Sequence, residues 1–250
     1  MTVGEFPPGC VLIFGKMPGT AGAVAKCFAK AGSAFALSYT QAPGLEEWQG
    51  LQDIDCRATF HCMDARIPGE AEAIIDQVIA AHERIHTVVW SVYDMAETCA
   101  LPGAEEDWGP RLYSHTQGIS RLVTAVRPHF RAAGGGSFVL LLAQECATAS
   151  ASTGLAASLK AASETMIRSI TEAEGGFGVR ANSVVLDLQS ETPGQRQASD
   201  EPAAPTGAGI GNRRQAPAAC SLLEEAGHSA VFLASRHAAR VTGQQIRLSV

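Results

Sequence analysis

The feature that most constrains the fold is a set of short runs in which every residue is apolar. Val11–Phe14 and Phe138–Leu142 are two such runs, and each is too short for a buried helix. A strand that is apolar at every position needs helices on both faces of its sheet, which is typical of parallel sheets. Segments with apolar residues at helical spacing, such as Ala71–Ile85, separate the runs. The sequence therefore predicts an α/β fold with a parallel sheet between two layers of helices.

The same patterns predict the order of the elements. Strands are expected at Val11–Phe14, Ala34–Ser38, Thr87–Trp90, Phe138–Leu142, Val179–Leu188 and Gln245–Val250. Helices are expected at Ala21–Ala31, Ala71–Ile85, Trp108–Arg131, Gly154–Glu174 and Ala218–Ser235. Residues 190–217 are rich in Pro, Gly, Gln and charged residues, which predicts an exposed, variable loop. The sequence has no internal repeat and no segment that indicates a second domain, so residues 1–250 are expected to form a single domain.

Composition excludes several classes of function. A net charge of −6 argues against a nucleic-acid surface, because binding to phosphates requires clustered Lys and Arg. No apolar run approaches the roughly 20 residues that span a bilayer, so no membrane segment is expected. Met1–Gly9 lacks the basic and apolar pattern of a signal peptide. The expected location is therefore the cytoplasm.

The seven cysteines are scattered and show no C-x-x-C spacing. The closest pair, Cys56 and Cys62, has His61 beside it. A structural zinc site needs four ligands at fixed spacings, so ordinary thiols are expected and no metal is predicted. Cysteines without a disulfide framework fit a reducing compartment.

Three segments resemble the short-chain dehydrogenase/reductase family. Val231–Ser235 and Val241–Gln244 are similar to its FLAS…TGQ segment, and Val179–Val184 resembles its IRVNAV strand. Gly15 and Gly19 match the first two glycines of its T-G-x-x-x-G-x-G loop. The resemblance implies a Rossmann-type, doubly wound parallel sheet in three α/β/α layers. It also implies an NAD-dependent dehydrogenase that assembles as dimers or tetramers.

The positions that carry the chemistry of this family have changed. In the family a Tyr-x-x-x-Lys pair acts with a Ser and an Asn, and Lys160 stands where the Lys belongs. The resemblance places Ala156 at the Tyr position, Ala143 at the Ser position and His115 at the Asn position. A Tyr-x-x-x-Lys motif occurs nowhere in the chain. Because alanine cannot donate a proton, no catalytic residue is expected, and Lys160 is vestigial.

The glycine-rich loop is only partly retained. Pyrophosphate binding needs small residues and free backbone N–H groups at the start of a helix. Gly15 and Gly19 are in phase with the family, but Ala21 takes the place of the third glycine. Pro18 also removes one backbone donor. The loop is therefore either a weak phosphate site or a tight structural turn, and the second interpretation is favoured.

The rest of the nucleotide site departs further from the family. Tyr39 stands where an acidic residue would hold the ribose, and Trp90–Tyr93 replaces the small Asn-Asn-Ala-Gly segment. Leu186–Asp187 replaces the Pro-Gly of the nicotinamide pocket. Asp64 alone matches, at the adenine-contacting position, although it fits a strand-end or helix-capping carboxylate equally well. With Gly15 and Gly19 it makes up the weak candidates for cofactor binding.

Three hypotheses for the function remain open. The first is a non-catalytic subunit that stabilises a catalytic, NAD-binding paralogue in a heterotetramer, whose substrate is a hydroxyacyl-CoA of anaerobic toluene degradation. The second is a stand-alone binding protein in which Trp90, Tyr93 and Met17 line a remodelled pocket. The third is a reductase of low activity that uses Lys160 and His115, although both residues fit structural roles. In the first hypothesis this chain binds no cofactor. The family's interface segments then correspond to Trp108–Arg131, Gly154–Glu174 and Ala218–Val250. Small residues of the second segment permit close packing of helices: Ala156, Ala157, Ala161 and Ala162.

Overall fold

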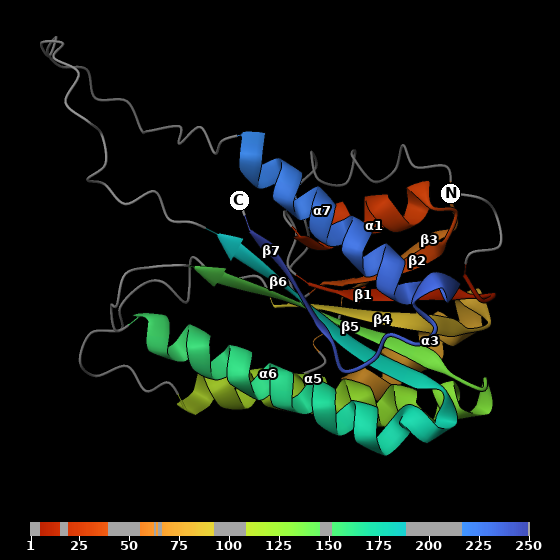
Figure 1. Ribbon diagram of the computed structural model, residues 1–250. Helices are drawn as coiled ribbons and strands as arrows, with labels where there is room; N and C mark the ends of the chain where they lie inside the picture. Colours follow the sequence, from red (N-terminus) through yellow and green to blue (C-terminus); the bar gives the residue numbers. More distant parts are fainter. Residues whose placement is uncertain are drawn as a thin grey trace, which may run out of the picture.

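The sheet has seven strands in the order β3-β2-β1-β4-β5-β6-β7, and every neighbouring pair is parallel (Figure 1). The computed structural model describes residues 6–15, 20–39, 56–62, 64, 67–92, 109–145, 152–188 and 217–249. The strands are β1 Cys10–Phe14, β2 Ala34–Tyr39, β3 Ala58–Cys62, β4 Ile85–Val92, β5 Gly136–Glu145, β6 Val179–Leu188 and β7 Gln245–Ser249. The order reverses between β1 and β4, which defines a doubly wound sheet and confirms the predicted Rossmann-type fold.

Helices cover both faces of the sheet (Figure 1). They are α1 Thr20–Lys30, α3 Glu70–His82, α5 Gly109–Ala132, α6 Ser152–Glu174 and α7 Pro217–Ala234, with short 3₁₀ turns η1 Gly175–Phe177 and η2 Arg236–Ala238. One face carries α1 and α7, whereas the other carries α3, α5 and α6. None of the described helices is long and apolar enough to cross a membrane.

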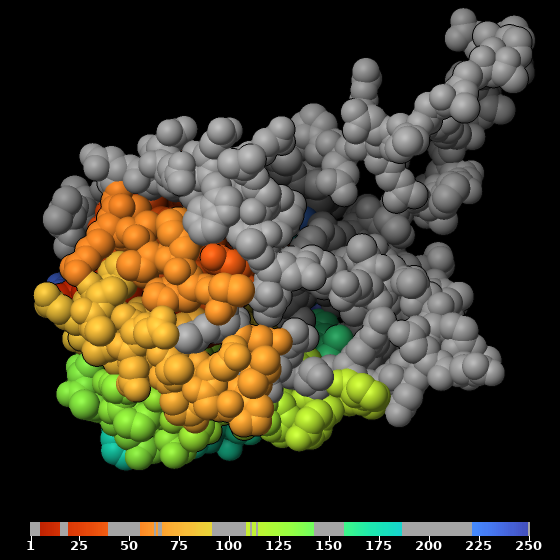
Figure 2. All heavy atoms as spheres, turned by 180° about the vertical axis from the view of Figure 1, so that it is seen from behind, coloured from red at the N-terminus to blue at the C-terminus, as the bar shows by residue number. Residues whose placement is uncertain are grey.

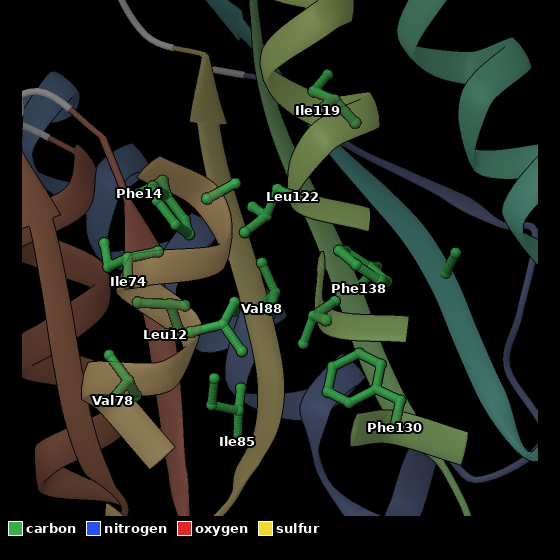
Figure 3. Packing of buried hydrophobic residues seen from close by; sticks show 14 of the residues in the cluster. Leu12, Phe14, Ile74, Val78, Ile85, Val88, Ile119, Leu122, Phe130 and Phe138 are labelled. Carbon is green, nitrogen blue, oxygen red and sulfur yellow. The ribbon is translucent and has the colours of Figure 1, made fainter. Parts of the chain in front are cut away.

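The core consists of two main clusters, one on each face of the sheet. Along β1, Leu12 and Phe14 point into the cluster beneath α3, α5 and α6, whereas Val11 and Ile13 point into the cluster beneath α1 and α7. Figure 3 shows side chains of the first cluster, where residues of the sheet and of the helices meet. Each fully buried large apolar side chain contributes about 1.5–3 kcal/mol to folding. Burial on both faces explains why the strand is apolar at every position.

The helix predicted at Ala71–Ile85 ends earlier than expected. α3 ends at His82, because Glu83 adopts a φ of 68° while its N–H bonds to the carbonyl of Ile79. Ile85, which has the right spacing for the buried face of the helix, instead begins β4 and is buried there. The periodicity alone could not separate a buried helix position from the first residue of a buried strand.

The strand β3 is absent from the sequence-based prediction, and the boundary between the predicted loop and α7 moves. β3 is an edge strand whose side chains are half-buried or exposed, so its residues Ala-Thr-Phe-His-Cys lack an apolar run. The predicted loop at 190–217 includes Pro217, which is the first residue of α7, a position where proline is favoured. Residues 190–216 and Trp108 lie outside the described residues.

Asn182 on β6 fixes the turn before β7. Its side chain is fully buried, and its Nδ2 donates to the carbonyl of Val241 at 2.9 Å. Its Oδ1 accepts the backbone N–H of Gln244 at 3.0 Å. The hydroxyl of Thr242 also accepts the N–H of Ala181 at 3.1 Å. Val179–Val184 and Val241–Gln244, which both resemble family segments, are therefore hydrogen-bonded to each other.

Arg180, two residues before Asn182, holds the end of α7. Its guanidinium donates to the carbonyls of Leu233 and Ala234 in the last turn of the helix. It also donates to the carbonyl of Ala238 in η2 at 3.0 Å. These carbonyls have no partner within their own helix, so the arginine satisfies acceptors that a helix end leaves free.

Candidate functional site

The candidate site lies at the carboxyl ends of β1 and β4, where the strand order reverses. In open α/β sheets, ligands bind outside the carboxyl ends of the strands at this point. Gly15 follows β1 directly and approaches β4 closely, since a Cβ on Gly15 would lie 2.9 Å from Cβ of Ala21 and 3.0 Å from Cβ of Ser91. Its N–H also donates to the carbonyl of Ser38 at 3.4 Å. Close packing alone therefore accounts for a glycine at this position.

We expect Gly15→Ala to lower the free energy of unfolding by about 1–3 kcal/mol, because the new methyl group overpacks the contact with Ala21 and Ser91. Urea denaturation measures the change. Gly176→Ala is the matched control, since no heavy atom lies within 4 Å of the place that its new methyl group would take. This control is expected to change stability by less than about 0.5 kcal/mol. Equal effects of the two substitutions would contradict the packing argument.

An aromatic pair occupies the sheet beside Gly15. Phe14 and Trp90 are partners in the register of β1 and β4, and their rings are stacked with centroids 5.3 Å apart. Trp90 is half-buried and packs against the cluster beneath α3, α5 and α6. Its ring is therefore used in the core of the protein. Three other residues of the site expected from the sequence lie outside the described residues, namely Met17, Gly19 and Tyr93.

Lys160 on α6 forms an ion pair one turn along its own helix. Its Nζ lies 2.8 Å from Oε1 of Glu164, which also accepts a hydrogen bond from the side chain of Gln245 on β7. The hydrogen bond from Lys160 lowers the pKa of the Glu164 carboxyl, and the bond from Gln245 acts in the same direction, whereas partial burial opposes both. Glu164 thus links the Lys160 ammonium group on α6 to the side chain of Gln245 on β7.

His115 on α5 is bonded to α6. Its Nε2 lies 2.9 Å from Oγ of Ser163, and the Ser163 hydroxyl donates to the carbonyl of Leu159 at 2.7 Å. Because the single hydroxyl proton goes to Leu159, Nε2–H of His115 is the donor to Ser163. Burial lowers the pKa of His115 to about 4, so the imidazole is neutral at pH 7. This nitrogen therefore joins α5 to α6.

Sequence comparison decides the family. A family model described as "Enoyl-(Acyl carrier protein) reductase" matches residues 15–249. The chain belongs to the short-chain dehydrogenase/reductase family. The match begins directly after β1, and it covers the other six strands and every helix that the structure describes.

Solved structures of short-chain dehydrogenases and related reductases share the fold at low identity. An NADH-dependent reductase A1-R' responsible for alginate metabolism has a TM-score of 0.74 and 16% identity, with 98% of this chain and 97% of that chain covered. The citronellol catabolism dehydrogenase AtuB of Pseudomonas aeruginosa PAO1 has a TM-score of 0.72 and 20% identity, with 100% and 96% covered. A hydroxysteroid dehydrogenase from Escherichia coli has a TM-score of 0.71 and 18% identity, with 98% and 97% covered. No curated protein matches the sequence.

The two alanines that the resemblance places at the family's Ser and Tyr positions lie in regular elements of the fold. Ala143 belongs to β5, where it is paired in register with Leu186 of β6, and Ala156 belongs to α6. Their side chains lie outside the described residues. Lys160 and Ser163 also belong to α6, so that helix carries Ala156, Lys160 and the partner of His115.

Asp64 lies apart from this group, in the connection between β3 and α3. Its backbone N–H donates to the carboxylate of Glu70 at 2.6 Å, and its carbonyl accepts the N–H of Ile67 at 2.8 Å. Gly69 is the N-cap residue of α3, so Asp64 does not cap that helix. Asp64 lies two residues beyond the end of β3.

Cys56, His61 and Cys62, for which the sequence predicts no metal, belong to β3 and the short stretch before it. The ring of His61 bonds to Oγ1 of Thr59 at 3.0 Å and to Oε1 of Gln77 at 3.3 Å. Within the part of the chain that the structure describes, no three His, Cys, Asp or Glu side chains are grouped so as to hold a metal ion. The His61 ring therefore serves the contact between β3 and α3.

Proposed function

We propose that this chain is the non-catalytic subunit of a hetero-oligomeric, NAD-dependent short-chain dehydrogenase in the cytoplasm. One observation carries the proposal: alanine stands at positions 143 and 156, where the family has its Ser and Tyr. A positioned acid or base contributes roughly 10²–10⁴-fold to the rate of a reaction. Alanine supplies neither an acid nor a hydrogen-bond donor for a developing alkoxide.

The contacts of the remaining polar residues support the same proposal. Lys160 is paired with Glu164, and Nε2 of His115 donates to Ser163. Both residues therefore already hold contacts of α6, one within that helix and one with α5. This consideration favours the non-catalytic hypothesis over a reductase of low activity.

The described residues also fit a dinucleotide poorly. Tyr39 ends β2, where the resemblance places the acidic residue that would hold the ribose. The contacts of Gly15 are explained by packing, and Asp64 lies in the connection before α3. We therefore place NAD in the catalytic partner subunit and no cofactor in this chain.

The partner in this proposal is a catalytic paralogue, and the assembly is a heterotetramer. The helices α5 and α6 and the C-terminal pair of α7 and β7 correspond to the family's interfaces. Among the small residues noted in the sequence, Ala161 is exposed and Ala162 is half-buried on α6, so a partner helix can approach there. A degenerate site in a chain of near-standard length also characterises the non-catalytic subunit of 2-[hydroxy(phenyl)methyl]succinyl-CoA dehydrogenase, from anaerobic toluene degradation. We propose that assembly, which acts on a hydroxyacyl-CoA, as the specific candidate.

The test is to co-express the chain with a catalytic paralogue from the same genome and to weigh the purified assembly by native mass spectrometry. The expected result is a mixed oligomer that binds NAD at half of its subunits and oxidises 2-[hydroxy(phenyl)methyl]succinyl-CoA. Lys160→Met in this chain should leave the turnover unchanged, whereas the same change at the catalytic lysine of the paralogue should abolish it. The proposal fails if the chain purifies only with itself, or if NAD occupies every subunit.

A further inference from the structure

The edge strand β3 meets α3 through polar side chains, and we call this contact the β3–α3 seam. Side chains along a strand point alternately to its two faces. On one face of β3, Ala58 and Phe60 pack against the apolar cluster beneath α1 and α7. On the other face, Thr59 and His61 hydrogen-bond to side chains of α3. This edge of the protein, drawn in orange to yellow, forms part of the surface in the rear view of Figure 2.

Three hydrogen bonds follow one another through the seam. Nε2 of His82 lies 2.9 Å from Oγ1 of Thr59, and the same oxygen lies 3.0 Å from Nε2 of His61. Nδ1 of His61 in turn lies 3.3 Å from Oε1 of Gln77. Since Gln77 and His82 both belong to α3, the series begins on the helix, passes through β3 and returns to the helix.

The partners of these bonds fix where each imidazole carries its proton. Oε1 of Gln77 can only accept, so Nδ1 of His61 donates to it. A neutral ring has one N–H, and Nε2 of His61 therefore accepts from the Thr59 hydroxyl. Thr59 has then used its only proton, so Nε2 of His82 is the donor to Oγ1. The two neutral rings are opposite tautomers, with the proton on Nδ1 in His61 and on Nε2 in His82.

Neither ring can take a second proton without loss of a bond or burial of a charge. On His61 the proton would occupy Nε2, which accepts from Thr59. On His82 it would occupy Nδ1, a buried atom that has no hydrogen-bond partner among the described residues. The side chain of His82 is only 3% exposed. Burial lowers the pKa of His82, and Arg57 and His61 act in the same direction.

The charged groups that face His82 belong to β3 and to the end of α3 itself. Arg57, directly before β3, donates to the carbonyl of Ala81, and Glu83 is exposed. Arg84 donates to the carbonyls that follow α5. Toward β4 and α5, the contacts of α3 are apolar and involve Ile74, Ile75, Val78, Ile85, Ile119 and Leu122. The guanidinium of Arg57 thus lies at the seam, where it repels a protonated His82.

We infer that the β3–α3 seam is an acid-sensitive switch, which holds the last turn of α3 on β3 at neutral pH and releases it on acidification. A histidine whose pKa is lowered in the folded protein stabilises the closed form fully above 6.5, its ordinary pKa, and progressively less below that value. After release, Ile74 and Val78 still hold the rest of α3 on the sheet, and Phe60 still holds β3. Release also relieves the turn at Glu83, whose φ of 68° is unfavourable for a residue other than glycine.

This inference goes beyond the proposed function, because it uses neither the alanines at the family positions nor the proposed interfaces. Hydrogen exchange of the full chain, followed by mass spectrometry, tests it. With the intrinsic effect of pH removed, amides of residues 79–84 should exchange up to about 10-fold faster at pH 5.5 than at pH 7.5, since pH 5.5 is one unit below the ordinary pKa of histidine. The amides of Glu83 and Arg84, which bond to the carbonyls of Ile79 and His82, report the last turn directly.

His82→Gln keeps a donor for Thr59 but cannot titrate, so it should remove the acceleration at residues 79–84. The acceleration in β5, which reports unfolding of the whole domain, should be the same in this variant and in the parent. Thr59→Val removes the hydroxyl between the two rings and should exchange at pH 7.5 as the parent does at pH 5.5. Thr124→Val, an equal change at an exposed position on α5, is the matched control and should exchange as the parent does.

Long-range ¹H–¹⁵N NMR spectra of the unaltered protein at pH 7.5 test the hydrogen-bond order without any substitution. They should show the proton on Nδ1 in His61 and on Nε2 in His82. The inference is overturned if the two rings are the same tautomer. It is equally overturned if His82→Gln keeps the acceleration of the parent, or if Thr59→Val exchanges as Thr124→Val does.

Discussion

Lowering the pH from 7.5 to 5 is expected to cost the protein about 2 kcal/mol of stability through His86 alone. The imidazole is buried between Ser33 and Thr87, with Nε2 3.0 Å from one hydroxyl and Nδ1 2.9 Å from the other. It also stacks on Phe6 with ring centroids 5.4 Å apart. Burial, assisted by the charge of Arg84, lowers the pKa of His86 to about 3.

The sign of the effect follows from the two states. The unfolded histidine takes up a proton near its ordinary pKa of 6.5, whereas the folded one stays neutral until about pH 3. The contribution to stability is therefore complete above pH 6.5 and is lost progressively as the pH falls towards 3, by about 1.4 kcal/mol per unit. His115, with its pKa lowered to about 4, adds a second loss over the upper part of the same range. A typical domain has only about 5–15 kcal/mol of stability, so the loss is a large fraction.

Urea denaturation at pH 7.5, 6 and 5 measures this dependence. His86→Gln keeps a side chain that can bond to both hydroxyls, but it removes the titrating group. We expect this variant to be less stable at pH 7.5, because the stack on Phe6 is lost, and to lose less stability on acidification than the parent. His228→Gln, the same substitution on the exposed side of α7, is the matched control. A parent-like slope in His86→Gln would contradict the assignment.

Asn182→Ala is expected to lower the free energy of unfolding by about 1–3 kcal/mol. The substitution leaves the carbonyl of Val241 and the N–H of Gln244 without their bonds to the side chain. A typical hydrogen bond contributes about 0.5–1.5 kcal/mol to stability, and two are lost here. The midpoint of urea denaturation should fall while the slope of the transition stays the same.

Gln244→Ala is the matched control for Asn182→Ala. The side chain of Gln244 is exposed and donates to the carbonyl of Thr242, at 3.1 Å, so its loss should cost less than about 0.5 kcal/mol. The backbone N–H that bonds to Asn182 remains in this variant. If the two substitutions cost the same, the bonds of Asn182 do not stabilise the turn before β7.

Strands in the middle of the sheet could be predicted from the sequence, whereas the edge of the sheet could not. β1 and β5 are buried on both faces, so an uninterrupted apolar run marks each of them. β3 is paired on one side only, and none of its side chains is fully buried. A sequence pattern records burial, and a half-exposed strand of five residues therefore has little signal of its own.

The contacts of the candidate site differ in how far they could be predicted. Lys160 and Glu164 are one helical turn apart, so their ion pair could have been inferred from spacing. The partner of His115 is Ser163, on a different helix, and no local pattern joins the two residues. The stack of Phe14 on Trp90 depends on the register between β1 and β4, which the sequence leaves open.

The place of β1 in the sheet also determines the order in which the chain can fold during synthesis. β1 lies between β2 and β4, so the N-terminal strand keeps one edge unpaired until residues 85–92 have left the ribosome. Likewise β6 completes its pairing only after residues 245–249 emerge, and Arg180 and Asn182 meet their partners in the same period. Exposed strand edges of this kind are sites of aggregation in incomplete chains. Translation speed between β1 and β4 therefore governs how long the nascent protein is at risk.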